Sequence, residues 1–194
     1  MKTIVKFFFL AAIMGLVLSC SKSDEIADEN PGSTLKSAKT HTVTSPFDAT
    51  FVGNYLPTSG VDPEMCGEYP MLRIYNEGEG TATHLGKFTH YFDFCVNDLT
   101  GEYPFDHMEA YFVAANGDSL FVYLSGQVVG GRLDHHPEDV NSYFTDDWFI
   151  LGGTGRFEGA TGSGVTDDYN RDSFPANSFH HWKGTITMVK GKRK

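Results

Sequence analysis

Two histidine pairs are the first residues whose types and spacing suggest chemistry. His135-His136 lies within an acidic stretch, and His180-His181 lies near the last predicted strand. Imidazole and carboxylate groups are zinc ligands, but neither pair has the spacing of H-E-x-x-H or of paired Cys-x-x-Cys. Neighbouring histidines on a strand also point to opposite faces. The sequence therefore predicts no metal site and no cofactor, and we interpret 134–147 as a solvated acidic loop.

Calcium is the alternative for two acidic pairs, Asp146-Asp147 and Asp167-Asp168. Oxygen-rich loops suit that ion, but the D-x-[DN]-x-[DN]-G spacing of a calcium loop is missing. The sequence gives this alternative little support.

Acid–base catalysis would fall to His84, Glu109 and Tyr111, which lie on predicted strands with candidate inward-facing positions. A carboxylate or imidazole in an apolar cavity has a displaced pKa and can act as an acid or a base. At outward positions the same side chains are simply solvated. No recognisable catalytic set accompanies them, so the sequence does not reveal a reaction.

The cysteines divide into one near the N-terminus and two in the body of the chain. Cys66 and Cys95 are 29 residues apart, and an oxidising compartment favours a disulfide between them. Two free buried thiols are the second interpretation. A catalytic cysteine is the third, because no nucleophile motif surrounds either residue.

The first nineteen residues, MKTIVKFFFLAAIMGLVLS, read as a targeting segment. A basic start precedes an apolar run that is shorter than the roughly 20 residues of a membrane span, which is typical of a secretory signal peptide. Cys20 follows directly, and the stretch 17–20 resembles the lipobox of bacterial lipoproteins, in which the cysteine is lipidated. The resemblance implies an outer-membrane lipoprotein of the cell envelope, facing the periplasm or the cell surface.

Composition then sets the organisation of the chain and its partners. With 194 residues and a formal net charge of −10, the chain has one domain of ordinary size and lacks the basic face of a nucleic-acid binder. We expect a signal peptide at 1–19, a lipidated cysteine and flexible acidic tether at 20–44, a β domain at 45–190 and a basic tail at 191–194. The membrane is then contacted through the lipid alone.

Short runs of β-branched and aromatic residues separated by Gly, Asn and Asp fill the predicted domain. The turns are clearest at 77–80 and 116–118, and no helical period follows the signal peptide. This pattern indicates an all-β fold with one antiparallel sheet, closed as a barrel or stacked as a sandwich. We predict strands at 47–55, 71–76, 80–85, 87–96, 108–114, 119–128, 143–151, 160–167 and 179–189.

The most distinctive motif is the glycine-rich stretch 152–164, GGTGRFEGATGSG. No Lys-Ser/Thr pair and no helix follow it, so it does not fit a phosphate-binding loop. We interpret it as a sharp structural turn between two strands, in which Phe157 closes the base of the sheet. The glycines that would permit its backbone angles are Gly152, Gly153, Gly155, Gly159 and Gly162.

This motif, with 81–89 (TATHLGKFT), 114–120 (AANGDSL) and 182–186 (WKGTI), resembles the allene oxide cyclase-like barrels and the plant dirigent proteins. The resemblance covers about Phe47 to Val189. It implies a single antiparallel eight-stranded closed barrel with a central cavity, and a homo-oligomer such as the dimers and trimers of the enzyme members. It assigns no catalytic residue here, because the matching motifs are turns and hairpins.

Three functions follow as hypotheses. The first is a lipid-anchored binding or structural module for a small hydrophobic ligand. The second is an isomerase or cyclase that folds a hydrophobic substrate inside the barrel. The third is a surface interaction protein that meets a partner through the acidic loops 134–147 and 167–172. An apolar pocket of at least about 300 Å³ would favour the first two, and a solidly packed barrel the third.

Cys20→Ser tests the lipid anchor. We expect the variant to leave the membrane fraction, because a lipid chain supplies about 0.8 kcal/mol per buried methylene and nothing else in the prediction holds the protein there. Fractionation of cells that express the wild type and the variant measures this. Unchanged membrane retention of the variant would contradict the prediction.

Overall fold

The structure is a computed structural model that describes residues 41–56, 59–103, 107–173 and 176–191. The predicted signal peptide, Cys20 and most of the tether lie outside the described residues, as does the basic tail after Gly191. No helix in the described ranges has the length and apolarity to cross a membrane.

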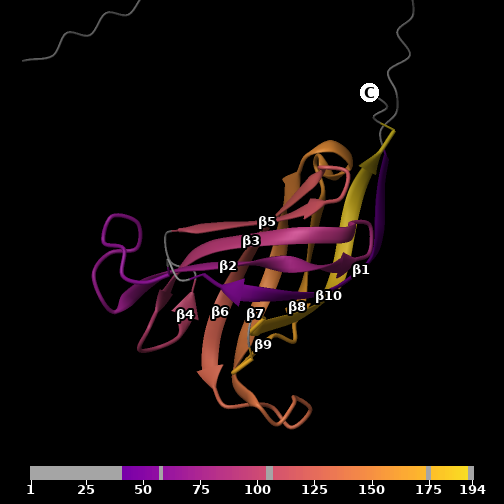
Figure 1. Cartoon of the computed structure of the whole chain (residues 1–194). Coiled ribbons are helices and arrows are strands. Elements are labelled where there is room, and N and C mark those ends of the chain that lie inside the picture. Colours follow the sequence, from indigo (N-terminus) through magenta and orange to yellow (C-terminus); the bar gives the residue numbers. More distant parts are fainter. Residues whose placement is uncertain (1–40, 57–58, 104–106, 174–175, 192–194) are drawn as a thin grey trace, which may run out of the picture. The chain divides into compact units, whose positions relative to one another are not determined.

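One antiparallel sheet contains every strand of the described residues (Figure 1). The strands are β1 (His41–Tyr55), β2 (Met71–Ala82), β3 (Gly86–Asn97), β4 (Glu102–Tyr103), β5 (Met108–Ala114), β6 (Ser119–Gly130), β7 (Val140–Gly153), β8 (Thr161–Thr166), β9 (Tyr169–Arg171) and β10 (Ser178–Lys190).

Eight of these described strands close into a barrel in the order β1, β2, β3, β5, β6, β7, β8 and β10, and β10 pairs back onto β1. Short β4 extends β6, and short β9 bridges β7 and β10. The predicted eight-stranded closed barrel is therefore present. Closure leaves the eight strands without a free edge along most of their length.

Large side chains fill most of the barrel interior. The Trp182 ring stacks on Trp148 at 5.6 Å between centroids and on Phe92 at 6.0 Å. Phe51 makes edge contacts with Phe88, Phe112 and Trp182. An interior of eight strands is just wide enough for side chains, so these rings leave no open channel along the barrel.

Glycines on β8 and β10 make room for Trp148. A Cβ on Gly164 would lie 2.6 Å from Trp148 Cζ2 and 2.0 Å from the Lys183 carbonyl oxygen, and a Cβ on Gly184 would lie 2.7 Å from the same ring atom. The backbone of these two strands therefore forms the wall against which the indole packs.

The glycine-rich turn and the 116–118 turn meet at one end of the barrel. A short 3-10 helix, η1 (Gly155–Phe157), follows β7 and buries the Phe157 ring completely. Gly155 has φ 57°, and the backbone N–H of Arg156 donates to Asp118 Oδ2 at 3.3 Å. Two motifs that are far apart in the sequence thus close the same end.

Some local predictions are wrong. The expected turn at 77–80 is instead part of the continuous strand β2. Gly78 and Gly80 lie there because the backbone of β2 comes very close to β1: a Cβ on Gly78 would lie 2.0 Å from the Val52 carbonyl oxygen. The chain reverses a few residues later, where His84 and Gly86 have positive φ. The strand at β1 also begins at His41, before the expected start of the domain.

The aromatic side of β6 is exposed to solvent. Leu120, Val122 and Leu124 point into the core, whereas Phe121 and Tyr123 are 41% and 36% exposed. The exposed apolar surface extends to Phe149 and Leu151 on β7 and to Val165 on β8, which are exposed as well.

Gly164→Ala tests the packing around Trp148. The added methyl group has to displace the indole or the strand, and we expect a loss of about 1–3 kcal/mol in the free energy of unfolding. Urea denaturation measures this. Gly130→Ala is the matched control, because a Cβ at Gly130 meets no atom within 4 Å and should change stability little. Equal stability of the two variants would contradict the packing argument.

Candidate functional site

A small cavity lies in the barrel interior, and buried polar side chains surround it. Its volume is about 20 Å³, which is about the space that one water molecule needs. The cavity is lined by Tyr55, Asn76, Phe92, Phe94, Tyr103, Met108, Leu124, Phe144, Asp146, Asp168, Ser178 and His180. The large central cavity that the family resemblance implies is therefore absent from the described part of the chain, and apolar and polar side chains together enclose the small space that remains.

Asp168, between β8 and β9, lies at the centre of the buried polar side chains. Its Oδ2 accepts hydrogen bonds from His180 Nδ1 at 2.6 Å and from Trp182 Nε1 at 2.8 Å. Its Oδ1 accepts a third from the backbone N–H of His181 at 2.9 Å. Because the carboxylate is only 2% exposed, these three donors replace the water that it loses on folding.

His180 links Asp168 to Ser178. In the neutral ring the contact with Asp168 places the proton on Nδ1, so Nε2 accepts the hydrogen bond of the Ser178 hydroxyl at 2.6 Å. Ser178 and His180 are two residues apart on β10 and therefore face the same side of the sheet. The result is a buried Ser–His–Asp chain of hydrogen bonds.

A second carboxyl, Asp146 on β7, faces the same cavity. Its oxygens accept hydrogen bonds from the hydroxyls of Tyr103, at 2.8 Å, and of Thr166. Burial raises the pKa of Asp146 to about 7, and the negative charge of Asp168 acts in the same direction. Asp146 can therefore hold or release a proton near neutral pH.

Two phenols and one amide complete the cluster. Burial raises the pKa of Tyr55 to about 12 and that of Tyr103 well above its usual value, so both stay protonated as hydrogen-bond donors. Asn76 Oδ1 pairs with His90 Nε2 at 2.8 Å. Its Nδ2 is buried and has no partner among the described residues. A buried donor of this kind favours an oxygen atom in the cavity.

The arrangement supports hydrogen bonding and proton transfer more readily than nucleophilic attack. The Ser178 hydroxyl is completely buried and already donates to His180, and the free space beside it is too small for an ester or amide group. Asp146, Tyr103 and Asn76 all line this cavity, and the Asn76 amide nitrogen has no partner among the described residues.

The three residues predicted for acid–base chemistry do not reach this cavity. His84 lies exposed in the β2–β3 turn, and Glu109 is exposed on the outer side of β5. Tyr111 is also on the outer side, where its ring packs 5.5 Å from that of Tyr91. The expectation that these three residues face inward is wrong. His84 lies in a turn, and on β5 the neighbours Ala110 and Phe112 take the inward positions.

The only signal in the sequence for this buried polar cluster is the alternation of residues along the last strand. Ser178, His180 and Trp182 occupy every second position of the last strand, which predicts one shared face. From the sequence, His180 is treated only as half of a candidate metal-binding pair with His181. Asp146 is placed in the solvated loop 134–147 and Asp168 in the acidic loop 167–172 offered to a partner, but these residues are 8% and 2% exposed.

The acidic surface proposed for a partner is consequently smaller than expected. Asp139 pairs with Arg171, and both His135 and His136 contact Asp167. The two histidines lie in the loop 131–139, not on a strand, so the expectation that they point to opposite faces is wrong as well.

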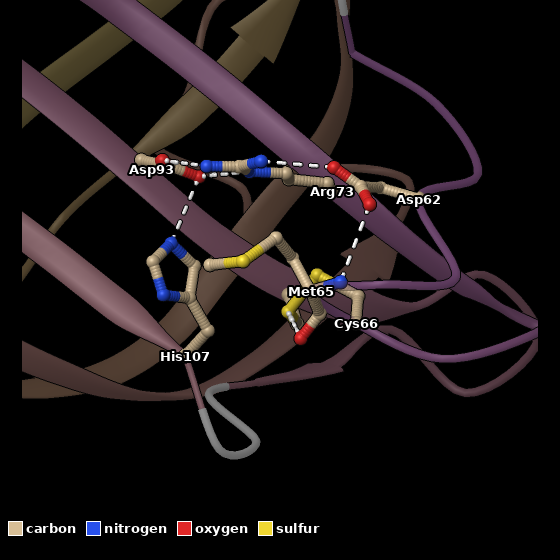
Figure 2. Close-up of a disulfide and its surroundings, with 7 residues drawn as sticks. Asp62, Met65, Cys66, Arg73, Asp93 and His107 are labelled. Atoms are coloured by element: carbon tan, nitrogen blue, oxygen red, sulfur yellow. Dashed lines mark hydrogen bonds and ion pairs between the residues drawn. A yellow bond between two sulfur atoms is a disulfide. The ribbon is translucent and has the colours of Figure 1, made fainter.

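Cys66 and Cys95 form a disulfide that joins the segment after β1 to β3 (Figure 2). Beside it, Arg73 donates to Asp93 Oδ1 and Oδ2 at 2.9 and 2.7 Å and to Asp62 Oδ2 at 2.8 Å. Burial opposes the ionisation of Asp93, but the hydrogen bonds of Arg73 and His107 keep its pKa below the usual value. This covalent and ionic connection holds the 59–70 segment on β2 and β3, outside the cavity.

Comparisons with known proteins give one similar structure. No family model and no curated protein sequence matches the chain. A pterocarpan synthase dirigent protein is similar over 84% of this chain and 97% of its own, with 13% identity and a TM-score of 0.36. The barrel assignment itself follows from the strand pairing described above.

Asp146→Asn tests the buried carboxyl through stability. Between the unfolded-state pKa of about 3.9 and the folded value of about 7, the folded protein keeps a proton that the unfolded chain loses, so ionisation of Asp146 destabilises the fold as pH rises. The variant cannot ionise. We expect its stability relative to wild type to increase from pH 4 to pH 7, by about 1.4 kcal/mol per unit of pKa shift.

Urea denaturation at pH 4, 5, 6 and 7 measures this difference. Asp147→Asn is the control, because Asp147 is the exposed neighbour on the same strand and should give a difference that does not change with pH. A pH-independent difference for Asp146→Asn would show that Asp146 ionises normally.

Proposed function

We propose that this protein is a lipid-anchored cell-envelope protein whose barrel binds a small ligand with an apolar body and one oxygen-bearing group. The observation that carries the proposal is the cluster of buried ionisable and hydrogen-bonding groups around the cavity, above all the unpartnered Asn76 amide, which lines the same cavity as Asp146 and Tyr103. Burying two carboxyls costs stability, so their presence in one cavity indicates a site and not a core.

The apolar body of the ligand has to enter by displacing side chains. The free volume of about 20 Å³ is far below the roughly 300 Å³ of a preformed small-molecule site, and on volume alone the packed barrel favours the surface-interaction hypothesis instead. The ligand proposal rests on the buried polar groups, and it requires these side chains to move. Tyr55, Met108 and Phe144 line the cavity and are only partly buried, so they are the side chains that can move outward. Met108 is flexible and can adapt to different shapes. Phe92, Phe94 and Leu124 then supply apolar contacts.

Native mass spectrometry of the protein isolated from its own membrane tests this proposal. We expect the wild type to carry a bound small molecule and Asp146→Ala to lose it, because the variant lacks the group that meets the ligand oxygen. Asp147→Ala, on the outer side of β7, should keep it. Wild-type protein without any bound molecule, or an Asp146→Ala variant that retains it, would contradict the proposal.

An isomerase that acts in the same cavity is the second candidate. The observation that favours it is the pKa of about 7 at Asp146, which suits a group that gives and takes a proton at neutral pH. Tyr103 donates to that carboxyl and would hold it in place. Incubating the recovered molecule with fresh protein separates the two functions: an isomer detected by NMR, absent with Asp146→Asn, indicates the enzyme, and an unchanged molecule indicates the binding module.

A further inference from the structure

We propose that His135, His136 and Asp167 bind a divalent transition-metal ion on the outside of the barrel. The two histidines lie in the loop 131–139 between β6 and β7, and Asp167 follows β8. This site is separate from the interior cavity, and it does not depend on the function proposed above.

The spacing of the three side chains suits a metal ion. The Nε2 atoms of His135 and His136 lie 2.9 and 3.0 Å from the same oxygen, Asp167 Oδ1. One ligand atom from each of the three residues lies within 4.8 Å of the others. Zinc binds imidazole nitrogen at about 2.0–2.1 Å, so tetrahedral ligands stand roughly 3.3–3.5 Å apart. The two histidine nitrogens therefore have to move away from Asp167 Oδ1 by roughly half an ångström, and no two ligand atoms are more than 4.8 Å apart.

The surrounding contacts hold the ligands in place. The His136 side chain is 2% exposed, and its ring packs 4.9 Å from that of Tyr169. The His135 ring lies 4.4 Å from that of His136.

One contact has to change when the ion binds. The backbone N–H of Leu133 donates to His136 Nδ1 at 3.3 Å, which places the ring proton on Nε2, where Asp167 accepts it. Coordination through Nε2 moves that proton to Nδ1 through solvent, with no net gain or loss, and breaks the contact with Leu133. This hydrogen bond is long and therefore weak, so the change in the loop costs little.

Three protein ligands leave a coordination position open. The three residues line a groove of about 310 Å³. An open position beside a groove is typical of metal sites that take a water molecule or an exchangeable ligand, in contrast to closed structural sites with four protein ligands. Imidazole and carboxylate ligands favour zinc, iron, cobalt or nickel over magnesium and calcium.

Zinc and cobalt titrations of the full chain, purified without a histidine tag, test the site. We expect isothermal titration with ZnCl2 to show one ion per chain, and Co²⁺ to give the visible absorption of a low-coordinate nitrogen and oxygen site. His135→Gln and Asp167→Asn should each weaken zinc binding by at least about 100-fold, since even the loss of a group that only orients a ligand costs 10–100-fold.

The variants are chosen to keep the fold. The His135 and Asp167 side chains are 60% and 43% exposed, so their replacement should leave the circular dichroism spectrum unchanged. His84→Asn is the matched control, an exposed histidine in another loop, and should bind zinc as the wild type does. No stoichiometric binding, or equal affinity in wild type and both variants, would overturn the proposal and leave Asp167 as a carboxylate that only fastens the loop.

Discussion

The width of an eight-stranded barrel is the constraint on which the rest of this structure depends. Such an interior has room for one layer of side chains from each wall and for little else. Here the two indoles and the phenylalanine rings occupy that room, and the glycines of β8 and β10 let the strands approach them. The packing confines the free space to a water-sized cavity, which makes the polar groups around it, and not its volume, the informative feature.

Those polar groups are tolerated because each charge has partners. Asp168 accepts three hydrogen bonds, and Asp146 accepts two from hydroxyl groups. The pairing is incomplete at Asn76 and His90, where a donor and an acceptor have no partner among the described residues. Burial and the neighbouring His180 lower the pKa of His90 to about 3, so the His90 ring is neutral. The unpartnered Asn76 donor is the feature that supports the proposed preference for a neutral ligand group with an oxygen atom.

The sequence predicted the fold well and the site poorly, and the physical reason is the same in both cases. Strand periodicity and the glycine turns are local signals, so the all-β class and the turn at Gly117 could be read directly. Whether an acidic residue faces inward depends on strand register, which is set by distant pairings. Asp146 looks identical to Asp147 in sequence, yet one lies in the core and the other in solvent. Gly78 and Gly80 led to a wrong turn prediction for the same reason, because they permit close contact with β1, a distant segment, and do not form a local turn.

Asp167 and Asp168 are joined by a single peptide bond, yet they serve opposite sides of the barrel wall. One carboxylate meets the loop histidines outside, and the other anchors the chain of hydrogen bonds inside. His180 lines both the outer groove and the inner cavity. The two side chains are attached to one planar peptide unit, so a backbone movement at Asp167 would be passed directly to Asp168.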